Sequence, residues 1–240
     1  MKIEHLATLN ESYVHSQLCL NRVAPSYLSV VRGPTDHVCV LAVGSYGRLE
    51  AHPEVSDFEW ITVYDDALVG KDEARRFQAD LTGFLADVFG RNRLSINKTF
   101  GDICSISGLC TNIGGEADTN RTLTYRMLAL AEGTVLHHNN AYEKIITGLA
   151  KTYGGSHTAG HRLLSLATDI ARYWRTLRID FKFKVDEGGK HWAVRNLKLR
   201  SSRRMWYLAS ALHLVAFGPR IEYTSTKVFD LEAVKTFMRD

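Results

Sequence analysis

The hydrophobic pattern in the first half of the chain changes period several times, and each change predicts an element. Residues 37–43 and 58–64 are short apolar runs rich in β-branched and aromatic side chains, which is typical of buried strands. Between 74 and 88, apolar residues recur at helical spacing and stop before Gly90, which predicts an amphipathic helix. A third strand is expected within 94–106, interrupted near its middle.

The rest of the pattern favours helices. Residues 3–32 predict a helix with a break near Pro25. No proline lies between Pro53 and Pro219, so long helices are permitted over that stretch. Apolar stripes at helical spacing predict further helices over about 123–130, 141–151, 163–177 and 196–217.

These elements predict a fold of the α/β (α+β) class, in which a small mixed sheet with flanking helices is followed by a helical bundle. The 240 residues are enough for one large domain or two modest ones. We expect an N-terminal helical segment over 1–35, a mixed domain over 36–119, and a helical domain with a basic block over 120–240.

Two sets of side chains are expected to be buried in the helical half. The first is a row on the last helix: Met205, Ala209, Leu212 and Ala216. The second comprises Trp174, Trp192 and Trp206, which we interpret as core residues rather than base-stacking platforms.

Composition narrows the class of protein. Hydrophobic residues make up 45% and charged residues 23% of the chain, which excludes disorder, collagen and coiled-coil rods. No apolar run reaches the ~18 residues of a membrane span, and the charged start does not resemble a secretory signal. The four cysteines form no Cys-x-x-Cys pair, so neither a disulfide framework nor a zinc site is expected. We therefore expect a cytoplasmic protein with free thiols and no membrane partner.

Charge is uneven along the chain. The segment 172–204 holds eleven lysines and arginines against three acidic residues, a net charge of +8, whereas the whole chain carries only +4. Such a basic block is either a surface that binds phosphate groups or a solvated helix face. At ~100° per residue, Arg172 and Arg175 fall opposite the apolar stripe of their helix.

The motif that suggests chemistry joins the first two strands. The first strand runs into residues 44–48 (Gly-Ser-Tyr-Gly-Arg), a glycine turn where backbone N–H groups can approach a phosphate. The second strand begins with Asp57 and Glu59, which alternation places on one face, opposite Phe58. Two converging carboxylates repel each other unless a cation lies between them. The expected chemistry is Mg²⁺ held by carboxylates and substrate phosphates.

This pattern resembles the DNA polymerase beta nucleotidyltransferase superfamily. Residues 44–50 with Ser56-Asp57 resemble the uridylyltransferases that modify the PII signalling protein and, more closely, their uncharacterised bacterial relatives. The pair Asp57 and Glu59 also resembles that of the kanamycin nucleotidyltransferases. Three later segments are similar to the same bacterial relatives: 113–120 leading into 123–127, 172–175, and 192–200. The resemblance thus extends over most of the chain, from about 36 to 212.

The resemblance implies a site and a mechanism. Gly44 and Ser45 would hold the β- and γ-phosphates of a nucleoside triphosphate. Asp57 and Glu59 would hold one or two Mg²⁺ (or Mn²⁺) ions as catalytic residues. An acceptor hydroxyl would attack the α-phosphate in line, and pyrophosphate would leave. The mixed domain over 36–119 would then be the catalytic domain.

Three arginines are candidates for phosphate contacts. Arg48 either binds phosphate or braces the turn through an ion pair with Glu50 or Glu54. Arg172 and Arg175 would complete the triphosphate site or grip an acceptor, and their alternative is a solvated helix face.

A third carboxylate usually completes the metal site of this superfamily, on the strand after the intervening helix. That strand offers only Asn97, and Asp102 is the nearest acid, so we expect Asp102 to be the third catalytic and metal-binding residue. Asp118 is the other candidate, although the run 118–120 (Asp-Thr-Asn) before Leu123 also fits a helix N-cap.

The expected function is therefore a metal-dependent transferase that moves a nucleoside monophosphate from ATP, UTP or another triphosphate to an acceptor hydroxyl. The acceptor is left open between a protein, a small molecule and an RNA, and the basic block favours RNA, including a toxin-like role. The nucleobase and the oligomeric state are left open too. The alternative is a non-catalytic nucleotide-binding regulator that kept the fold and lost the third acid.

Overall fold

The computed structural model describes residues 7–96, 100–111, 113–155, 163–186, 192–217, 235, 236 and 238. The fold is mixed α+β, with a small four-stranded mixed sheet and flanking helices. The chain forms two compact units. The first contains Met1–Leu109 with Glu132–Ile145, and the second contains Cys110–Ala131 with Ile146–Asp240.

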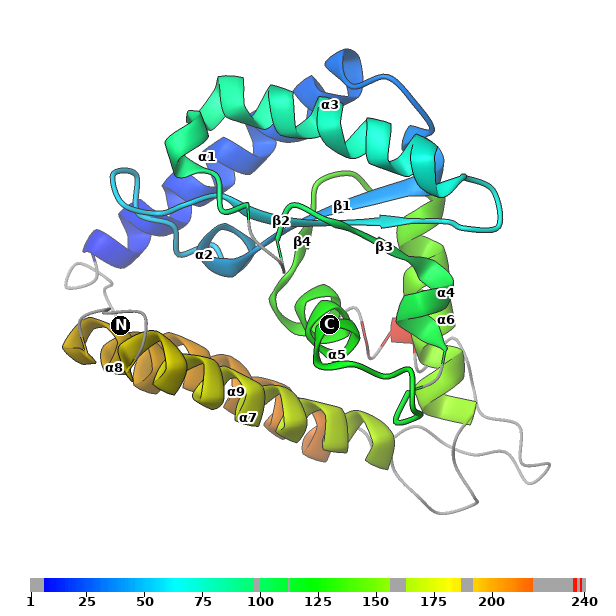
Figure 1. The fold of residues 1–240 in the computed structure, drawn as a ribbon. Helices are drawn as coiled ribbons and strands as arrows, with labels where there is room; N and C mark the ends of the chain where they lie inside the picture. Colours follow the sequence, from blue (N-terminus) through cyan, green and yellow to red (C-terminus); the bar gives the residue numbers. More distant parts are fainter. Residues whose placement is uncertain are drawn as a thin grey trace. The chain divides into compact units, whose positions relative to one another are not determined.

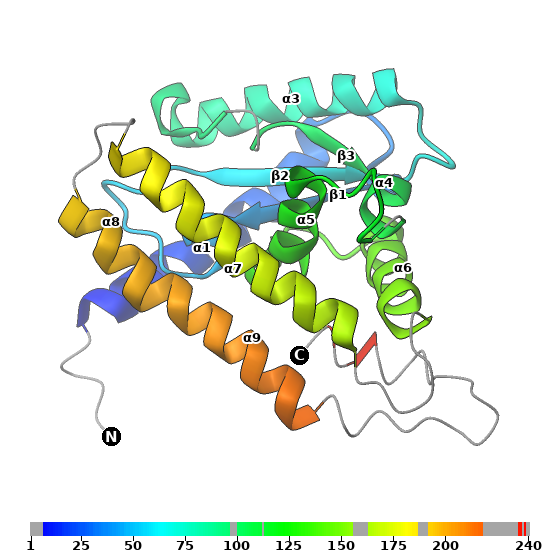
Figure 2. The ribbon, with the colours of Figure 1, turned by 60° about the horizontal axis from the view of Figure 1, so that its bottom comes forward.

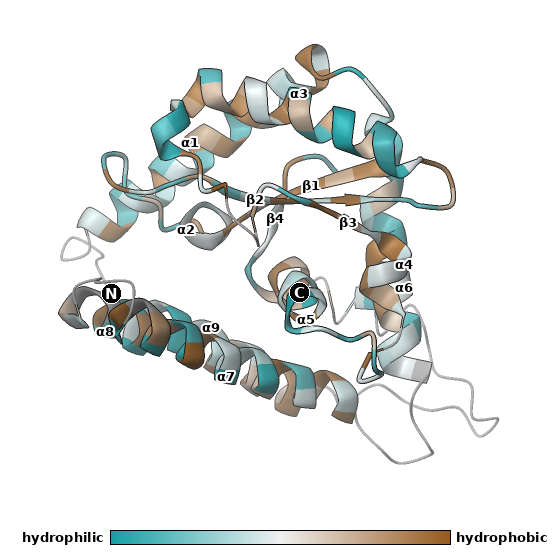
Figure 3. Ribbon diagram, in the orientation of Figure 1, coloured by the Kyte–Doolittle hydropathy of each residue, from teal (hydrophilic) through white to brown (hydrophobic). Residues whose placement is uncertain are grey.

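The first unit is built on a sheet with the strand order β3-β2-β1-β4 (Figure 1). Its strands are β1 (Val38–Val43), β2 (Glu59–Tyr64), β3 (Ile103–Ser105) and β4 (Thr134–Val135). β1 pairs antiparallel with both β2 and β4, whereas β2 pairs parallel with β3. The register between β1 and β2 places Val43 opposite Glu59. The two predicted apolar runs therefore form the central strands, and β1 is hydrophobic along its length (Figure 3).

Two helices cover one face of this sheet (Figure 1). They are α1 (Ala7–Val30) and α3 (Lys71–Phe89). Alternate strand residues point toward them, so that Phe58, Trp60 and Tyr64 share a core with one stripe of each helix. α3 ends at Gly90, whose φ of 85° and N–H bond to the carbonyl of Ala86 form a C-cap. The predicted helix with a glycine stop is therefore confirmed.

The expected break at Pro25 is wrong, because α1 is continuous and contains Pro25. Proline removes one helical hydrogen bond, to the carbonyl four residues earlier. Pro25 is exposed, on the solvent side of the helix, where a freed carbonyl can bond water. Val23 and Tyr27 are buried in the core on the other side. Their burial offsets the lost bond and keeps the helix intact.

Short elements connect these parts of the first unit. The interrupted third strand is present as an isolated parallel bridge between Phe58 and Leu94, followed by β3. α2 (Gly44–Gly47) follows β1 directly. Further short helices span Thr35–His37, Arg91–Arg93 and Ile106–Cys110, the last of these being α4.

The second unit consists of helices over its described residues. α5 (Asn120–Met127) continues into a π-helical turn over Leu128–Glu132, and Glu132 itself belongs to the first unit. α6 (Asn140–Gly155) begins in the first unit, and its residues from Ile146 onward belong to the second. α7 spans Leu164–Asp186, and α8 (Trp192–Lys198) runs through a π-helical turn (Leu199–Arg203) into α9 (Arg204–Phe217). α7 contacts α5, α8 and α9, and it lies beside α9 (Figure 2). The predicted helices are confirmed, while the turn expected at 187–189 lies outside the described residues.

The predicted inward row on the last helix is wrong. Met205 is 63% exposed and Leu212 is 66% exposed, and Ala209 and Ala216 are exposed too. The reason is that α9 is hydrophobic on nearly all sides, so the period of its sequence does not select a buried face.

The tryptophans of the second unit were also expected in the core, and two of them are not there. Trp192 and Trp206 are exposed, and Trp174 is partly buried.

Within the described ranges, no helix combines the length and the apolar character that crossing a membrane requires.

Candidate functional site

The glycine turn after β1 is tightly packed at both of its glycines. Gly44 has a φ of 63°, and a Cβ atom at this position would overlap the carboxylate of Glu59. A Cβ at Gly47 would overlap the backbone oxygens of Glu132 and Ala42. Both positions therefore require glycine, one for its backbone conformation and both for space.

The carboxylates of the motif flank a buried aromatic residue. Phe58 is fully buried, and its ring stacks on that of Phe89 with 4.4 Å between centroids. Glu59 follows on the opposite face of β2 and is half-buried, while Asp57 precedes Phe58 and is exposed. The alternation from Phe58 to Glu59 is therefore the predicted one.

Tyr46 holds the turn in the core, a role that the sequence analysis did not assign. Its ring lies 5.1 Å from that of Phe58 between centroids, and its hydroxyl is 3.3 Å from Nε2 of His15. The pKa of Tyr46 is raised to about 12, chiefly by burial and in smaller part by Cys19 and Asp57, while the positive charge of Arg93 acts in the opposite direction. The tyrosine is thus a neutral anchor for the turn at neutral pH.

Arg48 braces the turn through two carboxylates. Its Nε lies 2.6 Å from Glu50, and its Nη1 forms an ion pair with Glu132. Burial lowers the pKa of Arg48, but the charges of Glu132 and Glu50 outweigh burial and raise it. The ion pair with Glu50 is the bracing alternative considered above. Glu132 was missed, because it lies 84 residues away in sequence and no local pattern links the two.

Ser45 presents a different surface from its neighbours in the turn. It is half-buried, and its carbonyl oxygen accepts a bond from the N–H of Glu50 at 2.8 Å. Among the described residues its hydroxyl has no hydrogen-bond partner. The hydroxyl is therefore able to donate to a ligand without breaking a bond within that part of the chain.

Asp102 directly precedes β3, the strand that pairs parallel with β2. The register pairs Thr62 with Ile103 at the start of β3, and Asp102 itself is exposed. Its Oδ1 accepts a bond from the N–H of Ile103 at 2.7 Å. In the part of the chain that the structure describes, no three acidic, histidine or cysteine side chains form a group that could hold a metal ion. Asp102 as the third ligand stays a prediction, and Asn97 lies outside the described residues.

Asp118 belongs to a buried network in the second unit. Its carboxylate bonds Arg126 at 2.9 and 3.0 Å and Arg172 at 3.0 Å, and it accepts the N–H of Gly114. Burial raises the pKa of Asp118, but the hydrogen bonds from Arg126, Gly114 and Arg172 outweigh burial and hold it well below its ordinary value. The N-cap of α5 is Thr119, so the N-cap predicted within the run 118–120 is confirmed.

Asp169 completes this network. Arg126 is fully buried and also bonds Asp169 at 2.9 Å, and the hydroxyl of Tyr153 donates to the same carboxylate at 2.7 Å. Arg172 bonds Asp169 at 2.8 Å. The guanidinium of Arg172 is therefore shared between two carboxylates of its own unit.

Arg175 lies one helical turn beyond Arg172 on α7 and is exposed. Asp57 and Glu59 belong to the first unit, whereas Arg172 and Arg175 belong to the second. That these arginines join the carboxylates in one site stays a prediction.

Comparison of the chain with family models, with curated proteins and with solved structures gave no match.

Proposed function

We propose that this protein is a nucleotidyltransferase that moves a nucleoside monophosphate from a nucleoside triphosphate onto an acceptor hydroxyl, with release of pyrophosphate. The observation that carries the proposal is the contact between Gly44 and Glu59. It joins the glycine turn after β1 to a carboxylate at the start of β2, and the resemblance to the polymerase beta superfamily implies that these two features belong to one site. The nucleotidyltransferase-like arrangement of the first unit and a helical bundle in the second are parts of this proposal.

The residues present fit a divalent cation. Asp57 is exposed and forms no ion pair or hydrogen bond within the described residues, so its charge there is uncompensated. Glu59 follows two residues later, and carboxylate oxygens are ligands that Mg²⁺ and Mn²⁺ prefer. Asp57 and Glu59 would hold the ion, with Asp102 as the candidate third ligand. When bound, the ion would offset charge on the phosphates and on the leaving pyrophosphate.

The remaining residues of the turn bind and orient the triphosphate. Gly44 has no side chain, so its backbone can approach phosphate oxygens closely. Ser45 donates its hydroxyl to the same phosphates. Arg48 orients the turn without contacting the phosphates itself, because its guanidinium already pairs with Glu50 and Glu132. The substrate is ATP, UTP or a related triphosphate, and the acceptor is a protein, a small molecule or an RNA.

The test is a labelling reaction with each α-³²P nucleoside triphosphate, Mg²⁺ and a whole-cell extract. We expect one triphosphate to label an acceptor and to release pyrophosphate, with loss of both on chelation of the metal. Asp57→Asn and Glu59→Gln should abolish labelling, because each removes negative charge from the metal site. Asp72→Asn, at an exposed acid on α3, is the matched control and should label normally.

The outcomes separate this proposal from its alternative. Full labelling by Asp57→Asn or Glu59→Gln would refute the metal role of that residue. Nucleotide binding in calorimetry, without pyrophosphate release from any triphosphate, would instead favour a non-catalytic nucleotide-binding regulator.

A further inference from the structure

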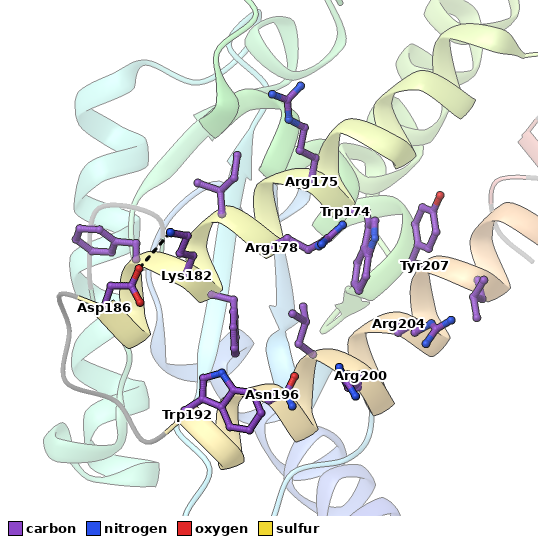
Figure 4. A pocket seen from close by; sticks show the side chains of 15 residues that line it. Trp174, Arg175, Arg178, Lys182, Asp186, Trp192, Asn196, Arg200, Arg204 and Tyr207 are labelled. Atoms are coloured by element: carbon purple, nitrogen blue, oxygen red, sulfur yellow. Dashed lines mark ion pairs between the residues drawn. The ribbon is translucent and has the colours of Figure 1, made fainter.

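An open groove of about 1260 Å³ runs between α7 and the continuous helix formed by α8 and α9 (Figure 4). We call it the α7–α9 groove. All of its described lining residues belong to the second unit, and none of them belongs to the glycine turn or its carboxylates. Its walls carry two kinds of side chain, cationic and aromatic, and each kind comes from both helices.

The cations of the α7–α9 groove greatly outnumber its acids. α7 contributes Arg175, Arg178 and Lys182, and the opposite wall contributes Arg200 and Arg204. The only acid among the described lining residues is Asp186, whose carboxylate lies 3.5 Å from Nζ of Lys182. None of the four guanidinium groups has an ion pair or hydrogen bond within the described ranges. The groove is therefore lined by four arginines whose charges have no carboxylate partner there.

The aromatic side chains lie between these cations. Trp174 and Tyr207 stack across the two walls, with 5.1 Å between ring centroids and 17° between ring planes. Arg178 extends toward Trp174 in Figure 4, whereas Arg175 points away from α9. Trp192 is 57% exposed and Phe183 is 56% exposed. Large exposed rings of this kind mark a binding surface rather than a packed core.

We infer that the α7–α9 groove binds single-stranded nucleic acid. Proteins that bind single strands without sequence preference combine a cationic groove along the backbone with aromatic rings on which bases stack. The arginines match the first requirement, because their planar forks pair phosphate oxygens in two-point contacts. The exposed rings of Trp192 and Phe183 match the second.

Two other occupants fit less well. A second copy of this chain would place the groove's net positive charge against itself if the same face were used twice, and like charges oppose such an interface. An acidic amphipathic helix would match the charge, but it inserts mainly aliphatic side chains. Of the eight apolar lining residues that the structure describes, five are aromatic and three are aliphatic: Trp174, Phe181, Phe183, Trp192 and Tyr207, then Ile179, Leu199 and Leu208. Rings flanked by unpaired arginines favour bases and phosphates.

The proposal does not depend on the transferase reaction, and its test measures binding alone. The probes are fluorescein-labelled U20 RNA and T20 DNA, titrated with the full-length protein in anisotropy measurements from low to physiological salt. We expect both single strands to bind more tightly than a 20-base-pair duplex. The comparison of U20 with T20 separates RNA from DNA as the preferred strand. Quenching of tryptophan fluorescence on binding is the second readout.

Two variants locate the binding surface. Arg200→Gln combined with Arg204→Gln should weaken binding at least tenfold. It should also reduce the slope of log K against log salt by about 1.4, at 0.7 per lost phosphate contact. Trp192→Ala should weaken binding about tenfold and reduce the quenching, because it removes a stacking ring. The matched charge control is Arg76→Gln combined with Arg91→Gln, two exposed arginines of the first unit, which should bind as wild type.

Each outcome decides the proposal. Equal losses in the groove and control variants, with intact circular dichroism, would overturn it, as would no binding of either single strand. Tighter binding of a 20-residue Leu/Glu amphipathic peptide than of U20 would assign the groove to a protein partner instead. A dimer in light scattering that Trp192→Ala dissociates would assign it to a second copy. The Asp57→Asn protein should bind U20 with the same affinity as wild type. Failure of the transferase proposal and failure of the groove proposal are therefore distinguished, because the first affects labelling and the second affects binding of U20.

Discussion

The carboxylate of Glu59 lies against the Cα of Gly44, in the space that a Cβ would occupy in any other residue. The antiparallel register that pairs Val43 with Glu59 brings the two together. Gly44 also has a φ of 63°, a conformation that other residues adopt at a cost. A single position thus combines a steric demand with a backbone demand.

Gly44→Ala should therefore destabilise the protein by roughly 1–3 kcal/mol, from overlap with Glu59 and from backbone strain. Gly83→Ala is the matched control. Gly83 lies within α3 with nothing near its Cβ position, so alanine there should stabilise the helix by up to about 1 kcal/mol. Urea denaturation at pH 7 measures both.

A double-mutant cycle identifies the source of the Gly44 effect. With Glu59→Ala already present, Gly44→Ala should destabilise less than it does alone, because the overlapping carboxylate is gone. Equal effects of Gly44→Ala in both backgrounds would show that Glu59 does not occupy this space.

Arg48→Met should destabilise the first unit by roughly 3–5 kcal/mol, because it removes the Arg48 ion pair from the buried carboxylate of Glu132. Glu50→Gln should have a smaller effect, since Glu50 is partly exposed and Arg48 keeps Glu132. Arg76→Met, at an exposed arginine on α3, should change stability by no more than about 0.5 kcal/mol. An Arg48→Met protein as stable as Arg76→Met would exclude the bracing role.

Asp118 gives the second unit a pH-dependent contribution to stability. Its pKa in the folded protein lies below the ordinary value, which is about 3.9 for the unfolded chain. The folded state therefore binds the proton less readily than the unfolded state. The contribution is fully present above about pH 5 and is lost as pH falls through the folded pKa.

Asp118→Asn should accordingly destabilise the protein by roughly 3 kcal/mol at pH 7, because Arg126 loses a buried charged partner. The difference in unfolding free energy from wild type should stay constant between about pH 5 and 8 and shrink below about pH 4. Denaturation at several pH values measures this, with Asp72→Asn as the exposed control. A difference that grows as pH falls would reverse the assignment.

The different exposures of Leu212 on α9 and Leu81 on α3 predict different effects of alanine substitution on stability. Leu212→Ala should change stability by no more than about 0.5 kcal/mol, since Leu212 lies on the exposed face. Leu81→Ala should destabilise by roughly 2–5 kcal/mol, because Leu81 is fully buried on α3 in the core of the first unit. A large loss for Leu212→Ala would mean that another part of the chain covers α9.

The sheet and α3 were predictable because their signals are local. The run at 37–43 forms β1, and the helix that stops before Gly90 ends there in a glycine cap. A glycine turn at position 44 was also predictable, because the glycine directly follows an apolar strand. Its contact with Glu59 was not, because it depends on the register between two strands, which residue types alone do not specify.

The buried ion pairs were not predictable, because they join residues far apart in sequence. Arg48 meets Glu132 across 84 positions, and Arg126 meets Asp169 across 43. From its own position in the sequence, each of these charged residues would be expected at the surface, because charged side chains are mostly exposed. The exposed face of α9 was mispredicted for the opposite reason, since hydrophobic residues on nearly all sides leave no period to read.

The chain passes between its two compact units at three places: between residues 109 and 110, 131 and 132, and 145 and 146. Neither unit is therefore encoded by one continuous gene segment. A fragment that ends after Leu109 would lack β4 and leave β1 with an unpaired edge. A single crossover during recombination cannot exchange either unit whole. Exchange of either unit whole would need more than one crossover, so recombination tends to keep the two units together.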